Sequence, residues 1–104
     1  MYKVYNTTRF DKELSKLSLE EQKRIQSIYT QLRDNPYVGD QLRYKFLREK
    51  RLKEKRIYYL IYDDLKAVLI VAISDKKTQQ DTINHIVDFF EEYKVYVNKL
   101  VNKN

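Results

Sequence analysis

Several residue types that carry chemistry are rare in this 104-residue chain. It has no cysteine and no tryptophan, and one residue each of glycine, proline and histidine. Without cysteine there is no disulfide, thiolate nucleophile or cysteine-ligated metal site, which suits a reducing cytoplasm. With Gly39 as the sole glycine, a glycine-rich phosphate loop and a nucleophile elbow are excluded too. We therefore expect neither a metal ion nor another cofactor.

Long apolar runs are also missing. No segment approaches the roughly 20 apolar residues of a membrane span, and residues 1–10 lack the apolar stretch of a signal peptide. A hydrophobic content of 42% beside 35% charged residues is ordinary for a globular protein. We expect a single domain over residues 1–104, located in the cytoplasm and without a membrane partner.

Positive charge is in excess and concentrated in one stretch. Between Arg43 and Arg56, eight basic residues stand against Glu49 and Glu54, so these residues carry the whole formal net charge of +6. Protection of a sheet edge needs one or two charges, so a solvated edge strand is the weaker explanation. Tyrosines follow directly at positions 58, 59 and 62, and aromatic rings beside cations favour single-stranded RNA as the partner.

The spacing of apolar residues predicts an α+β fold. A strand over residues 2–6 precedes a helix hairpin, whose helices begin at Thr7 or Thr8 and at Ser18, and which Asn35-Pro36 ends. Short links between the next strands predict a small antiparallel sheet of about four strands, with a fully apolar strand over 67–73. A long C-terminal helix is expected over about 78–101.

Residue parity suggests which tyrosines face outward. Arg56, Tyr58 and Tyr62 share one face of their strand, and the apolar residues between them share the other. We expect Arg56 and Tyr58 on the solvent side, although a plain core or edge role for Tyr58 or Tyr59 stays open. His85 is expected at the surface.

On the last helix, Phe89 and Tyr96 lie beyond the main apolar stripe. They suggest a partner surface and a homodimer formed through this helix.

Arginine and lysine, with or without a tyrosine, can support RNA cleavage. The 2′-OH of the substrate is the nucleophile, so the protein must align it, neutralise the phosphorane charge and assist proton transfer. DNA has no 2′-OH and could not be cut in this way.

The order of the motifs resembles the RelE/ParE superfamily of toxins from type II toxin-antitoxin systems, and most of all archaeal RelE-like mRNA interferases. The resemblance covers residues 2 to about 80 and rests on Asn35-Pro36, Leu47-Arg48-Glu49-Lys50-Arg51, Arg56-Ile57-Tyr58-Tyr59 and Ile73-Ser74-Asp75-Lys76-Lys77. It implies metal-independent cleavage of mRNA on the ribosome. It also implies an antitoxin partner, expected to be acidic, that wraps an open basic face of the sheet.

The resemblance implies roles for individual residues. Arg56 matches a strand arginine that contacts the scissile phosphate, and Lys76 and Lys77 match a basic pair after the last strand. These three are the predicted catalytic residues, and the predicted RNA-binding residues are Lys45, Arg48, Lys50, Arg51 and Tyr58. A tyrosine or histidine that often follows the basic pair is missing here, where Thr78-Gln79-Gln80-Asp81 stands instead.

Two alternatives stay open. A ParE-like toxin would inhibit DNA gyrase by binding it, and fold alone does not separate the two activities. A non-catalytic member of the family would bind RNA or antitoxin only, which agrees with the missing tyrosine.

Overall fold

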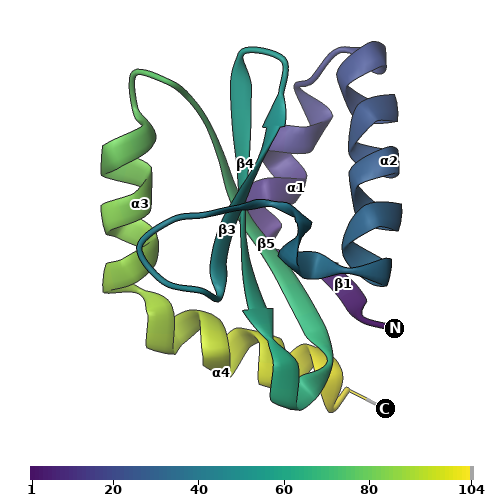
Figure 1. The fold of residues 1–104 in the computed structure, drawn as a ribbon, viewed down its shortest axis with the longest axis vertical. Helices are drawn as coiled ribbons and strands as arrows, with labels where there is room; N and C mark the ends of the chain where they lie inside the picture. Colours follow the sequence, from purple (N-terminus) through teal and green to yellow (C-terminus); the bar gives the residue numbers. More distant parts are fainter. Residues whose placement is uncertain (104) are drawn as a thin grey trace.

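The computed structural model describes residues 1–103, which form a five-stranded sheet with helices on both faces (Figure 1). Four α-helices and two short 3-10 turns complete this part of the chain. In chain order the elements are β1 (Lys3–Asn6), α1 (Thr8–Ser15), α2 (Leu19–Asp34), η1 (Pro36–Val38), β2 (Asp40–Gln41), β3 (Leu47–Leu52), β4 (Lys55–Tyr62), η2 (Asp63–Leu65), β5 (Ala67–Asp75), α3 (Gln79–Asp88) and α4 (Phe90–Val101).

The sheet has the strand order β1-β5-β4-β3-β2. Strands β2 to β5 pair antiparallel, as expected from their short links, whereas β1 pairs parallel with β5. The α+β class is confirmed, but the expected sheet of about four antiparallel strands is wrong in detail. Strands β1 and β5 are separated by residues 7–66 and not by a short turn. The length of the link therefore could not predict whether these two strands pair parallel or antiparallel.

The helix hairpin covers one face of the sheet, as predicted. The Thr7 hydroxyl accepts a hydrogen bond from the Phe10 amide at the start of α1. Ser18 and Glu21 form a reciprocal capping box at the start of α2. The buried stripe of this hairpin packs on the odd-numbered residues of β4 and comprises Phe10, Leu17, Ile25, Ile28 and Leu32.

The C-terminal segment is helical, but it forms two helices instead of one long helix. The helix ends at Asp88, Phe89 takes φ −106° and ψ 20°, and α4 begins at Phe90. Figure 1 shows the chain changing direction between α3 and α4. Without a glycine or proline at this point, the apolar spacing could not reveal the break. It lets Phe90 pack on Phe46, with ring centroids 4.7 Å apart, while Phe89 stays 44% exposed.

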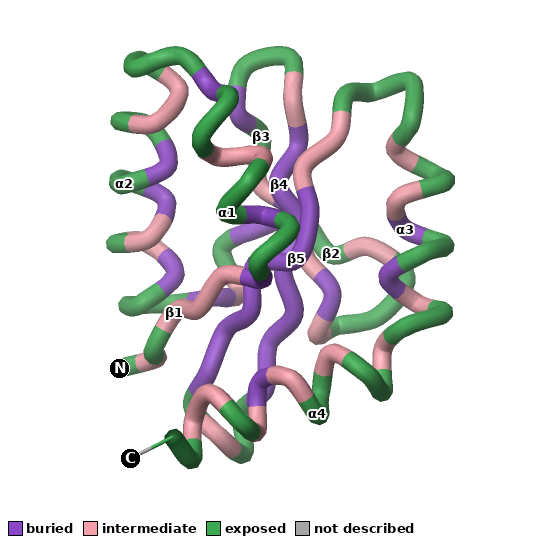
Figure 2. The backbone as a smooth tube through the Cα atoms, turned by 180° about the vertical axis from the view of Figure 1, so that it is seen from behind, coloured by how far each residue is buried: buried purple, intermediate pink, exposed green. Residues whose placement is uncertain are grey.

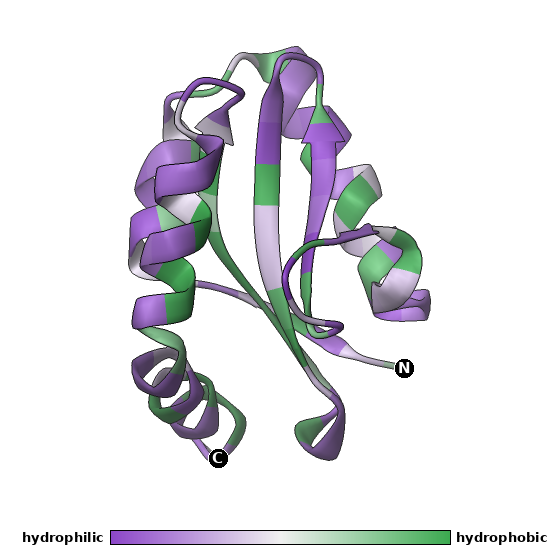
Figure 3. Ribbon diagram, turned by 60° about the vertical axis from the view of Figure 1, so that its left-hand side comes forward, coloured by the Kyte–Doolittle hydropathy of each residue, from purple (hydrophilic) through white to green (hydrophobic). Residues whose placement is uncertain are grey.

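The second helix pair covers the other face of the sheet, so the central strands are buried on both sides (Figure 2). Figure 3 shows β4 hydrophilic where it leaves the hairpin with β3 and more hydrophobic toward its end, whereas β3 is hydrophilic over most of its length. No helix in residues 1–103 combines the length and the apolar character needed to cross a membrane.

Candidate nucleic-acid interface

Strand pairing gathers a subset of the basic residues at the hydrophilic end of the sheet. Arg51 on β3 lies opposite Arg56 on β4, which in turn lies opposite Ser74 on β5. Paired residues of antiparallel strands project from the same face, so the two arginines are neighbours. Lys76 and Lys77 follow β5 directly and are exposed. We call Arg51, Arg56, Lys76 and Lys77 the cationic site.

Arg56 is not fully open to solvent. The residue is 9% exposed, and its Nε lies 3.4 Å from the Glu49 Oε2 carboxylate oxygen, while that Nε makes no well-formed hydrogen bond. The other Glu49 oxygen accepts a 2.8 Å hydrogen bond from the Gln79 side chain at the start of α3. The two terminal guanidinium nitrogens of Arg56 donate no hydrogen bond to residues 1–103. Unlike Nε, neither of them is a buried atom that lacks a hydrogen bond. That fork of donors remains available to a phosphate.

The expected exposure of Tyr58 is wrong. It does lie on the Arg56 side of β4, as parity requires, but its accessible surface is 0% because α3 and α4 cover this face. Its hydroxyl is 2.7 Å from the Ser74 hydroxyl, and burial raises the pKa of the phenol. A ring sealed in this way cannot stack on a base.

The other predicted RNA-binding residues lie apart from the cationic site. Arg48 faces the helix hairpin side and donates to the carbonyls of Lys45 (2.8 Å) and Gly39 (3.1 Å). Lys50 shares that side, opposite Ile57, and is half-buried. Lys45 lies in the β2–β3 loop, with its ammonium 5.5 Å from the centre of the Tyr37 ring. The basic stretch therefore does not form one open face, because successive strand residues point to opposite sides.

Two further cations at the hairpin tip are paired with the first turn of α2. Lys53 Nζ lies 2.9 Å from Glu20 Oε2, and Lys55 Nζ lies 3.3 Å from Glu21 Oε2. Exposed pairs of this kind contribute little to stability. They do take both lysines away from the cationic site, toward the helix hairpin.

The β5–α3 loop has its own internal support. The Asp75 carboxylate accepts hydrogen bonds of 3.0 Å from both the amide and the hydroxyl of Thr78. The bond from the amide has the larger effect, and both bonds lower the pKa of Asp75. The two exposed lysines of the site thus stand in a loop that is fixed at both ends, by β5 and by the first turn of α3.

Sequence reasoning missed Glu49 and Gln79. Glu49 carried a usable signal: it is an acid inside a basic run, and its parity matches that of Arg51 on the same strand. Gln79 carried no such signal, since its contact depends on where α3 begins and how it packs. The acidic partner of Arg56 therefore appears only when β3 and β4 are aligned.

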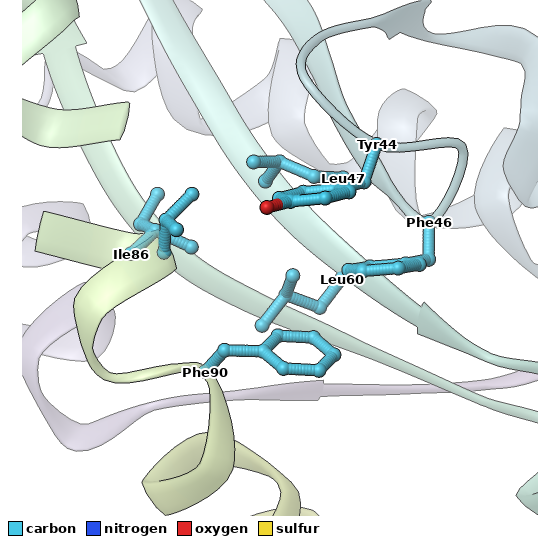
Figure 4. Close-up of a pocket in the computed structure, with 7 residues that line it drawn as sticks. Tyr44, Phe46, Leu47, Leu60, Ile86 and Phe90 are labelled. Atoms are coloured by element: carbon cyan, nitrogen blue, oxygen red, sulfur yellow. The ribbon is translucent and has the colours of Figure 1, made fainter. Parts of the chain in front are cut away.

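An apolar cavity of about 250 Å³ lies on the same sheet face, beside the α3–α4 junction (Figure 4). No charged side chain lines it; its walls are formed by Tyr44, Phe46, Leu47, Leu60, Ile86, Val87 and Phe90. The Tyr44 hydroxyl is the one polar side-chain group among these residues. Residues 1–103 likewise hold no cluster of three or more potential metal-ligating His, Asp or Glu side chains.

The residues expected to form a partner surface on the last helix are only partly exposed. Phe89 contacts His85 with their rings tilted by 33° and ring centroids 4.6 Å apart, and both are exposed. Tyr96 is half-buried, and its hydroxyl reaches the Asn6 carbonyl at 3.5 Å. A homodimer through this segment stays a prediction.

Comparison with known proteins gives structural matches but no sequence match. No family model and no curated protein matches the chain. The isolated E. coli RelE toxin superposes with a TM-score of 0.65 at 14% identity, covering 83% of this chain and 99% of the toxin. A RelE chain from the RelE-RelB complex of Pyrococcus horikoshii gives 0.62 at 21% identity, covering 72% and 94%. The RelBE2 toxin-antitoxin complex of Mycobacterium tuberculosis gives 0.62 at 25% identity, covering 72% and 91%.

These likenesses show that the chain has the fold of the RelE toxins. The resemblance to the RelE/ParE superfamily seen in the sequence is therefore confirmed at the level of the fold.

Proposed function

We propose that this chain, which has the fold of the RelE toxins, is the toxin of a type II toxin-antitoxin system and cleaves mRNA on the ribosome in the cytoplasm. The observation that carries the proposal is the meeting of Arg51, Arg56 and the Lys76-Lys77 pair at one end of such a fold. Four cations at a sheet end suit a chain of phosphates.

The cationic site provides what metal-independent RNA cleavage needs. The free terminal nitrogens of Arg56 form a planar fork that can bind two phosphate oxygens and stabilise the charge of the pentacoordinate phosphorane. Arg51 is exposed beside it and can hold an adjacent phosphate. Lys76 or Lys77 can protonate the leaving 5′ oxygen. No metal ion is required for these steps.

The partner we infer is a cognate antitoxin with an acidic surface. The structural neighbours include RelE bound to an antitoxin, and a chain of net charge +6 attracts acidic proteins. Binding of such a protein over Arg51, Lys76 and Lys77 would exclude RNA by charge and by volume.

Expression in cells, with mapping of mRNA 5′ ends, tests the proposed cleavage. We expect growth arrest and new mRNA ends with the natural chain, and roughly a hundredfold fewer ends with Arg56→Lys, which keeps the charge but loses the fork. Arg24→Ala, an exposed change on α2, is the matched control and should leave cleavage intact.

The same cultures separate the alternatives. Arrest with intact mRNA and blocked DNA supercoiling would identify a ParE-like gyrase inhibitor. Binding of RNA or antitoxin without arrest or cleavage would identify a non-catalytic member.

A further inference from the structure

RNA cleavage by the proposed route needs a group that accepts the proton of the attacking 2′-OH. Lysine side chains ordinarily carry their proton at neutral pH, so they suit donation to the leaving oxygen better than acceptance from the nucleophile. The tyrosine or histidine that could have served is missing after Lys77. His85 is exposed on α3 and its ring contacts that of Phe89, which itself lies outside the cationic site.

Glu49 is the carboxylate that meets this need by position. Its Oε2 lies 3.4 Å from Arg56 Nε, a contact too poorly aligned to form a hydrogen bond, so that oxygen keeps lone pairs free. Glu49 and Arg51 have the same parity on β3, so both project toward the face on which Arg56 lies. The side chains of Glu49 and Arg56 are 8% and 11% exposed, so neither is completely sealed.

We propose, on the premise of the RNA cleavage proposed above, that Glu49 is a catalytic residue and takes the proton from the 2′-OH. As that proton moves to Oε2, the 2′ oxygen bonds to phosphorus, and the bond from phosphorus to the 5′ oxygen breaks. The leaving oxygen takes a proton from Lys76 or Lys77. The products are a 2′,3′-cyclic phosphate and a 5′-hydroxyl, with no oxidant, reductant or metal ion consumed.

The arrangement of Arg56 and Glu49 fits two neighbouring atoms of one substrate. When the fork of Arg56 holds the phosphate oxygens, the ribose that carries the 2′-OH lies next to that phosphate. A carboxylate on the Nε edge of the same guanidinium is then within reach of the hydroxyl.

Gln79 is a positioning residue for this carboxylate. Its amide donates to Oε1 at 2.8 Å and so leaves Oε2, the oxygen nearer Arg56, as the proton acceptor. Gln79 stands in the first turn of α3, so the start of this helix fixes its position.

The groups around Glu49 define its electrostatic setting. Arg56 and Tyr58 face it from β4, Asp40 lies opposite it on β2, and Arg51 follows it on β3. From α3 the contact is the uncharged Gln79. The setting of Glu49 thus combines two guanidinium groups with one carboxylate on the edge strand.

A pH–rate profile of the unmodified protein tests the proposal without any substitution. Single-turnover cleavage of mRNA on programmed ribosomes is measured from pH 5 to pH 9. With a carboxylate acceptor the rate is level around neutrality and falls at the acidic end, as the acceptor becomes protonated. A rate that instead rises about tenfold per pH unit through neutrality would assign the role to a lysine and overturn the proposal.

Substitution of Glu49 gives the second test. Glu49→Gln keeps the size of the side chain but removes the acceptor, and we expect the single-turnover rate to fall by about a hundredfold or more. Binding of an RNA blocked at the 2′ position should stay the same or improve, because a negative charge is lost. Glu54→Gln, in the exposed turn of the same hairpin, is the matched control and should cleave normally.

Folding is controlled separately, because loss of Glu49 leaves Arg56 without its buried partner. The thermal midpoint of each variant is measured, and Glu49→Asp replaces Glu49→Gln if the latter unfolds. The aspartate keeps the charge but is one methylene shorter, so a misplaced acceptor should still slow cleavage at least tenfold.

The outcomes separate the inference from its premise. If the unmodified chain cleaves no RNA, the proposed function and the role of Glu49 both fall. If it cleaves and a folded Glu49 variant cleaves within tenfold of it, the role of Glu49 alone falls. A rate loss matched by an equal loss of RNA affinity would mean that Glu49 shapes the binding surface only, and it too overturns the proposal.

Discussion

Tyr59 ties the loop between α2 and β3 to the middle of the sheet. It is fully buried; its hydroxyl donates to the Pro36 carbonyl at 2.6 Å and accepts from the Gly39 amide at 3.0 Å. Burial raises the pKa of the phenol to about 12, so it is protonated at neutral pH. A Cβ at position 39 would collide with that hydroxyl and with the Glu49 carbonyl, which explains the single glycine.

Replacing Tyr59 by phenylalanine should destabilise the protein. The change removes two hydrogen bonds and leaves a buried carbonyl and a buried amide without partners, which costs roughly 2 kcal/mol. Urea unfolding measures the loss. Tyr5→Phe is the control, since the Tyr5 hydroxyl makes no hydrogen bond to residues 1–103, and equal stability of the two variants would contradict the expectation.

Asp63 joins two aromatic residues from different parts of the chain. Its carboxylate accepts hydrogen bonds of 2.5 Å from the hydroxyls of Tyr2 and Tyr37. Both bonds lower the pKa of Asp63, and the bond from Tyr2 has the larger effect. The two bonds join the start of the chain and η1 to the turn that links β4 with β5.

The lowered pKa of Asp63 predicts a pH dependence of stability. A carboxylate whose pKa falls on folding stabilises the native state above its unfolded-state pKa of about 4, and this contribution is lost as the pH falls through the lower, folded-state pKa. Asp63→Asn should therefore lower the stability at pH 7 and flatten its decline in acid. Asp64→Asn, in the same turn, should leave the decline unchanged; urea midpoints from pH 2 to pH 7 measure both.

At the scale of single residues, parity correctly separated Arg56 and Tyr58 from Ile57 and Tyr59. It failed to predict exposure, because exposure depends on what covers a face as well as on which face a residue occupies. Arg48 shows the same limit: its guanidinium is held by the carbonyls of Lys45 and Gly39, which no strand pattern encodes.

Helix α2 owes its start to a local motif that the sequence displays. Ser18 and Glu21 each satisfy a backbone amide of the other, and Glu20 and Glu21 suit the positive end of the helix dipole. The start of α2 is therefore set by residues next to it in the sequence.

Loss of this cap should cost about 1 kcal/mol. Ser18→Ala removes the acceptor of the Glu21 amide at 3.1 Å, and that amide has no other partner within the helix. Ser27→Ala is the control in the same helix: it is exposed in the middle of α2, where alanine is a good helix former, so its free energy of unfolding should not fall. Equal losses in chemical denaturation would refute a capping role.

Elements with local signals were predicted well and those set by distant contacts were not. The caps at Thr7 and Ser18, the end of α2 before Pro36 and the apolar run of β5 all follow from neighbouring residues. The break at Phe89 accompanies packing of Phe90 against Phe46 in the β2–β3 loop, which periodicity along one helix cannot show.

For the molecule as a whole, basic residues that are close in the sequence do not share one surface. The basic stretch 43–56 carries the whole formal net charge, yet it contributes Arg51 and Arg56 alone to the cationic site. Of the remaining cations, Lys53 and Lys55 pair with α2, and Arg43 donates to Asn84 on α3. The net positive charge could be counted from the sequence, whereas the number of phosphates that the protein contacts could not.

Salt dependence of RNA binding measures that number. Four phosphate contacts predict a slope of log K against log salt near −2.8 for single-stranded RNA blocked against cleavage. Lys77→Gln should reduce the slope by about 0.7, and Lys23→Gln, on the exposed side of α2, should leave it unchanged. A flat dependence, or equal effects of the two changes, would remove the cationic site as the RNA contact.

The parallel pairing of β1 with β5 has a consequence during synthesis. Lys3 and Ala67 are register partners, so the first strand has no hydrogen-bonding edge until the sixties of the nascent chain have left the exit tunnel. The two partners are distant in the sequence, and closing a long loop slows folding. Strand β1 therefore joins the sheet late in synthesis, only after β5 has left the exit tunnel.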